Sequence, residues 1–147
     1  MLGIADALSN AMSASTDVAL ILWNSDVIEL MSLVLLRRNV SSGGIEPSEG
    51  IERISNFISS CSPAVIVFDL DPPYLRSASE VLYLVDHFPN YHFVMTCADR
   101  NLALKSAPRL SDYPLFQKPY GFDDVAETVH SMVIRGSSRP AAVSLAG

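Results

Sequence analysis

Apolar residues along this chain follow two alternating patterns. Uninterrupted apolar runs, bounded by polar residues, alternate with segments in which apolar positions recur every three or four residues. The runs are typical of strands that are buried on both faces of a parallel sheet, whereas the second spacing places apolar side chains along one side of a helix. The pattern therefore predicts a chain of alternating strands and helices.

Five strands are predicted from the apolar runs. The clearest is Ala64 to Phe68, five consecutive apolar residues that end on Asp69. A segment containing Gly43 and Gly44 is the weakest, and it is assigned as an edge strand because glycine offers no side chain to pack. The five predicted strands are 17–23, 40–46, 64–69, 91–95 and 115–117.

Each strand is followed by a predicted helix. Asp26 is expected to cap the first helix, Pro47 to begin the second, and Ser77 or Ser79 to cap the third. The fourth, 102–107, is short because Pro108 interrupts it. The stripes that define the longer helices are 27–35, 51–58, 81–88 and 122–133.

This order predicts an α/β fold, a doubly wound (βα)5 unit with a five-stranded parallel sheet and helices on both faces. A chain of 147 residues is the length of one domain. We expect an N-terminal extension over 1–16 and the domain over 17–134. Residues 135–147 carry Gly, Ser, Pro and Ala without apolar periodicity, which predicts a disordered tail.

Composition narrows the classes of function. The net charge of −6 argues against nucleic acid as a direct partner. No apolar run approaches the ~20 residues that a membrane helix needs, and the first residues lack the basic start of a secretory signal, so a cytoplasmic protein is expected. Cys61 and Cys97 are too few for a disulfide framework or a zinc site.

Three polar residues fall where predicted strands end. Asp69, Thr96 and Lys118 follow the third, fourth and fifth apolar runs. The carboxyl ends of strands in a doubly wound sheet converge on one crevice, where ligands bind. Asp69 alone could also be explained as a loop cap, because strand-terminal Asp is common in turns. Enzyme classes with a G-x-S-x-G elbow, a P-loop or a G-x-G-x-x-G turn are disfavoured, because the chain contains none of these motifs.

Over residues 17–134 the chain resembles the receiver domain of two-component response regulators. The matching motifs are Asp69-Leu70-Asp71-Pro72-Pro73, Thr96-Cys97-Ala98 and Lys118-Pro119-Tyr120. The resemblance implies a flavodoxin-like fold with strand order 2-1-3-4-5. It also implies phosphoryl transfer from a partner histidine kinase or phosphotransfer protein to Asp69, the nucleophile, with Lys118 and Thr96 binding phosphoryl oxygens. A changed surface would then bind a downstream protein.

The chain departs from that family at two places. Receivers hold Mg²⁺ with an acidic pair after the first strand, where this chain has Asn24-Ser25, so magnesium affinity is expected to fall. The remaining candidate ligands are Asp69, the backbone of Asp71, Asn24 and Asp26, although Asp26 is as readily a helix cap and Asp71 a solvated loop residue. At the position where the family has a switch aromatic, three residues before the lysine, this chain has Leu115.

Two functional hypotheses follow. The leading one is a stand-alone, atypical receiver of a phosphorelay that accepts a phosphoryl group on Asp69 and is no enzyme beyond that self-modification. The alternative is a pseudo-receiver, an adaptor that binds a protein partner without phosphorylation, and Asn24-Ser25 and Leu115 favour it. Both leave formation of a homodimer open. Trp23, the single tryptophan, is expected to pack, with shielding of the pocket as the other reading.

Overall fold

A computed structural model of the chain describes residues 16–146, with side chains over 16–135. The predicted extension 1–16 therefore lies outside the described residues, apart from Thr16. The strands are β1 (Val18–Ile21), β2 (Ser42–Ile45), β3 (Val65–Leu70), β4 (His92–Cys97) and β5 (Leu115–Gln117). The α-helices are α2 (Ser25–Leu36), α3 (Ile51–Cys61), α4 (Tyr74–His87), α5 (Arg100–Ser106) and α6 (Phe122–Ala146). Two short 3-10 turns are η1 (Pro47–Glu49) and η2 (Pro108–Asp112).

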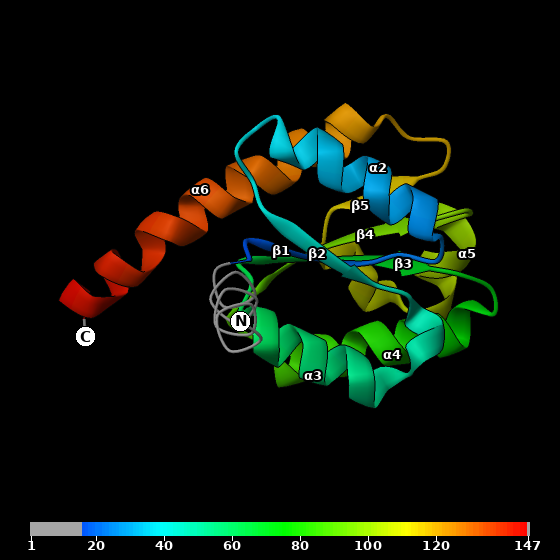
Figure 1. The fold of residues 1–147 in the computed structure, drawn as a ribbon. Coiled ribbons are helices and arrows are strands. Elements are labelled where there is room, and N and C mark those ends of the chain that lie inside the picture. The colour runs from blue at the N-terminus through cyan, green and yellow to red at the C-terminus, as the bar shows by residue number, and fades with distance from the viewer. Residues whose placement is uncertain (1–15, 147) are drawn as a thin grey trace, which may run out of the picture.

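The five strands form one parallel sheet in the order β2-β1-β3-β4-β5. This confirms the predicted flavodoxin-like architecture and its 2-1-3-4-5 order. Figure 1 shows the sheet between two layers of helices, with α2 and α6 on one side and α3, α4 and α5 on the other. Within residues 16–146, no helix has the combined length and apolar character needed to span a membrane.

Alternation along the central strands explains the two layers. All six residues of β3 are buried, so both of its faces must be covered. Ile66 and Phe68 belong to the core under α3, α4 and α5, whereas Val65 and Val67 belong to the core under α2 and α6. Asp69 continues the second set, because successive side chains of a strand point to opposite faces. Its side chain therefore lies on the α2 and α6 side of the sheet.

The glycines of β2 have a packing role that composition did not reveal. A Cβ atom on Gly44 would lie 2.3 Å from Cγ2 of Ile28, a side chain of α2. On Gly43 it would lie 3.3 Å from the tip of the Phe57 ring, a side chain of α3. The edge strand β2 therefore carries glycine at these positions because helices on both faces of the sheet approach its backbone closely.

Several predicted element ends are wrong. Asn24, not Asp26, caps α2, since its Oδ1 accepts a hydrogen bond from the Asp26 backbone N–H at 2.7 Å. The helix α4 begins directly after Pro73 at Tyr74 rather than at Ser77 or Ser79. Proline is tolerated there because the first helical positions need no backbone N–H.

The end of the chain also differs from expectation. The helix α6 continues to Ala146, through the residues predicted as a disordered tail. Gly136 and Pro140 are poor helix formers, so the local sequence does not account for this continuation. Figure 1 shows this part of α6 extending past the end of the sheet.

The close contact at Gly44 gives a testable consequence. We expect Gly44→Ala to lower the free energy of unfolding by about 1–3 kcal/mol, because the Cγ2 and Cβ atoms of the branched Ile28 side chain cannot move aside without repacking α2. The matched control is Gly43→Ala, whose new methyl group comes closest to the end of the Phe57 ring, at 3.3 Å. Urea unfolding midpoints at constant m-value measure the difference. Equal midpoints for the two variants would contradict this packing.

Candidate functional site

The sheet register brings Asp69 and Thr96 together. These two residues are direct partners across the parallel pair β3 and β4. Lys118 is the first residue after β5, and its backbone N–H donates to the carbonyl of Cys97 at 2.8 Å, which fixes the start of the following loop beside β4. All three predicted site residues therefore meet at the carboxyl edge of the sheet.

Both carboxylate oxygens of Asp69 are engaged. The Thr96 hydroxyl donates to Oδ1 at 2.7 Å, and the Lys118 ammonium group donates to Oδ2 at 2.9 Å. The Asp69 side chain is only 5% exposed and Thr96 is fully buried, whereas the Lys118 side chain is 41% exposed. A buried carboxylate is stable only when it is paired and hydrogen-bonded. Thr96 and Lys118 satisfy that requirement from within the chain.

Trp23 is the fourth member of the site. Its indole Nε1–H donates to the backbone carbonyl of Asp69 at 3.0 Å, across 46 positions of sequence. This bond fixes the indole beside the strand that carries the acid. Trp23, Asn24, Lys118 and Tyr120 contribute, with Asp69, to the walls of a cleft of about 310 Å³, whose remaining lining residues are Val27, Pro119 and Phe122.

Tyr120 is also coupled to this site. Burial, and to a lesser extent the negative charge of Asp69, raise the pKa of its phenol to about 12, although a hydrogen bond with the Thr96 side chain offsets part of the rise. The phenol therefore stays neutral well above physiological pH. Tyr120 stands two residues after Lys118, and its aromatic ring completes the apolar side of the cleft.

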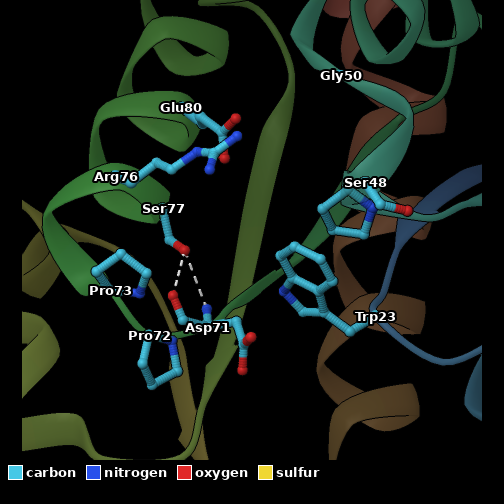
Figure 2. Close-up of a pocket in the computed structure, with 10 residues that line it drawn as sticks. Trp23, Ser48, Gly50, Asp71, Pro72, Pro73, Arg76, Ser77 and Glu80 are labelled. Carbon is cyan, nitrogen blue, oxygen red and sulfur yellow. Dashed lines mark hydrogen bonds between the residues drawn. The ribbon is translucent and has the colours of Figure 1, made fainter.

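A second cleft, of about 320 Å³, lies on the other side of Trp23. Figure 2 shows the indole facing Asp71 and the two prolines, with Ser48 and Gly50 above it on the right and Arg76 and Glu80 at the upper left. Ser77 closes the turn that leads from β3 to α4. Its hydroxyl donates to the Asp71 carbonyl and accepts from the Asp71 N–H at 3.1 Å.

The residues expected to hold Mg²⁺ are not assembled into a metal site. Oδ1 of Asn24 accepts the α2 capping bond, the Asp71 carbonyl accepts from Ser77, and Asp26 is exposed outside both clefts. Among residues 16–135, no three His, Cys, Asp or Glu side chains come close enough to share an ion. Mg²⁺ prefers several oxygen ligands, including one or two carboxylates. The donor set around Asp69 does not fit that ion.

The structure shows which residues lie beside Asp69, where receivers carry their acidic pair. Trp23 and Asn24, not Asn24 and Ser25, line the cleft that holds Asp69, and Ser25 already begins α2 as an exposed residue. An indole thus stands beside the acid, together with an amide. Leu115, at the family's aromatic position, is buried in the core under α3, α4 and α5.

Sequence reasoning missed three contributors to the site. Tyr120 contacts Thr96 over a long sequence separation, and Ser77 bonds to Asp71 within a local turn, and apolar spacing encodes neither contact. Trp23 was placed at the end of the first strand as a packing residue, but its bond to Asp69 was not expected. The available signal was an indole N–H at a strand end, because a partly buried tryptophan usually finds an acceptor for it.

Comparison with known proteins supports the fold. No protein-family model matches the sequence, and no curated protein matches it. Among solved structures, the signal receiver domain of a LuxO repressor protein from Vibrio parahaemolyticus is similar at a TM-score of 0.68 and 14% identity, over 87% of this chain and 97% of that domain.

Two further structures agree. A transiently phosphorylated "switch" of bacterial signal transduction is similar at a TM-score of 0.67 and 15% identity, over 83% of this chain and 97% of its own. A CheY-like protein, TadZ, from Pseudomonas aeruginosa is similar at a TM-score of 0.63 and 14% identity, over 80% of this chain and 99% of that one. The chain has the fold of a response-regulator receiver domain.

The pairing of Asp69 with Lys118 gives a stability prediction. Lys118→Met leaves a buried carboxylate with Thr96 as its remaining donor, so we expect the free energy of unfolding to fall by about 1–3 kcal/mol. The loss stays below that of a fully buried pair because water reaches the half-exposed lysine position. Lys105→Met, at an exposed position of α5, is the matched control. Equal unfolding midpoints for the two variants would show that the ion pair does not stabilise the fold.

Proposed function

We propose that this chain is a receiver-fold signalling module that binds a downstream protein without Mg²⁺-dependent phosphorylation of Asp69. The observation that carries the proposal is the state of the Asp69 carboxylate. Both of its oxygens are bonded within the chain, its side chain is 5% exposed, and Trp23 and Asn24 stand where carboxylates would be needed.

Charge accounts for why such a site is a poor phosphoryl acceptor. An incoming phosphoryl group is negative and so is the attacking carboxylate, and phosphoryl transfer depends on nearby cations to neutralise that charge. Lys118 supplies one positive charge, which Asp69 already balances. Without a cation held beside them, the reactants repel one another. We therefore assign Asp69 a structural role, in which it holds β3, β4 and the loop after β5 together.

The second candidate is the atypical phosphoacceptor, and one observation favours it. Thr96 and Lys118 lie at 2.7 and 2.9 Å from the two oxygens of Asp69, on the side chain that would be modified. In that case Asp69 is the nucleophile that accepts the phosphoryl group from a histidine kinase or phosphotransfer protein. Lys118 and Thr96 then move from the carboxylate to the phosphoryl oxygens.

Both candidates share the coarser features of the module. In each the chain acts through a protein partner rather than by turnover of a substrate, and self-modification at Asp69 is at most a single event. The charge of −6 leaves nucleic acid as an unfavourable direct partner. The two differ only in whether modification of Asp69 controls that partner.

Chemical phosphorylation separates the candidates. The chain is incubated with phosphoramidate and millimolar Mg²⁺, and its intact mass is measured. We expect no gain of a phosphoryl group. The variant Trp23→Asp/Asn24→Asp, checked for folding by circular dichroism, restores carboxylates beside Asp69 and is expected to gain one group under the same conditions. Modification of the natural chain that disappears in Asp69→Asn would overturn the proposal in favour of the phosphoacceptor.

A further inference from the structure

The helix α2 carries two apolar faces, of which only one packs against the sheet. Met31 and Leu35 are fully buried in the core. Leu30, Leu33 and Leu36 are 50%, 52% and 62% exposed. These three leucines are spaced by three residues, so they lie within an arc of about 120° on the outer side of the helix. A surface helix of a monomer normally keeps this side polar.

Charged residues of opposite sign border this leucine face at its two ends. Glu29 is exposed near the start of α2, and Arg37 is exposed at its C-cap. Neither takes part in an ion pair with another described residue, whereas the neighbouring Arg38 is bonded to Asp123 of α6 at 3.8 Å. The helical spacing places Glu29 and Arg37 within the same arc as the leucines.

The order of these residues is symmetric about Leu33. Leu30 and Leu36 are equally distant from it in sequence, and so are Glu29 and Arg37. If a second α2 is laid antiparallel over the first, Leu33 meets its own copy and Leu30 meets Leu36 of the other chain. Glu29 then meets Arg37 of the other chain, twice. Such self-complementarity is what an interface with two-fold symmetry requires.

We propose that the outer face of α2 is the interface of a symmetric homodimer of this chain. A partner of another kind needs apolar surface and opposite charge, but it does not need the pattern to be complementary to its own reverse. Figure 1 shows α2 in the helix layer that it shares with α6, and the exposure of Leu30, Leu33 and Leu36 shows that the described residues leave this face largely uncovered. One helix pair buries less than a standard interface of about 1,600 Å², so a transient, concentration-dependent dimer is expected.

Charge exchange tests the dimer directly. Sedimentation velocity of the full chain is measured from micromolar to near-millimolar concentration, and a concentration-dependent shift to the dimer is expected. Glu29→Arg and Arg37→Glu each place like charges together at both ends of the interface, so each is expected to weaken self-association by about tenfold or more. Glu52→Arg, an exposed position of α3, is the control and is expected to leave the dimer unchanged.

The decisive arm mixes the two weakened variants. In a heterodimer of Glu29→Arg with Arg37→Glu, each arginine again faces a glutamate, so the mixture is expected to associate more tightly than either variant alone. The double variant on one chain is expected to recover the dimer as well. Monomers at every concentration of the natural chain would overturn the proposal and assign the leucines to another occupant, such as residues 1–15 or a different protein. A dimer that neither single variant weakens would overturn it too.

Discussion

The carboxylate of Asp69 is the group whose needs shape the carboxyl edge of this sheet. An ionised carboxylate excluded from water is costly unless its oxygens find donors. Thr96 from β4 and Lys118 from the loop after β5 provide them, so three consecutive strands are joined at one point. The Trp23 indole adds the strand β1 through the backbone of the same residue. Four of the five strands thus meet at Asp69.

These contacts also determine what the site is able to do. In a receiver that is phosphorylated, the acid must accept both a metal ion and a phosphoryl group. Here both oxygens are hydrogen-bonded to Thr96 and Lys118. The neighbouring side chains are the Trp23 indole and the Asn24 amide, which carry no negative charge to attract a cation. Under the proposed function, the arrangement that satisfies the acid within the chain also makes it a poor nucleophile. Asn24 links this edge to the proposed dimer face, because it caps the helix whose outer side carries Leu30, Leu33 and Leu36.

Much of the architecture follows from local patterns. The burial of β3 on both faces and the strand-end positions of Asp69, Thr96 and Lys118 are encoded in apolar runs, and the parallel order then brings the three polar residues together. Features that depend on specific contacts were harder to predict. Asn24 and Asp26 are both good caps, and only the geometry decides for Asn24. Gly44 resembled a weakness of the edge strand until the approach of Ile28 explained it. The extent of α6 was not predicted, because Gly136 and Pro140 give no local preference for helix after residue 135.

The proposed function requires that Asp69 is satisfied within the chain and that no magnesium site assembles beside it. The indole N–H of Trp23 reports on this most directly, because it is the single tryptophan signal and is bonded to the Asp69 carbonyl. Its nitrogen and proton NMR shifts should be followed as Mg²⁺ is raised to several millimolar, against a sodium control of equal ionic strength. We predict no change beyond that control. A saturable shift of the Trp23 signal with Mg²⁺ would show that the ion binds beside Asp69 and would overturn the proposed function.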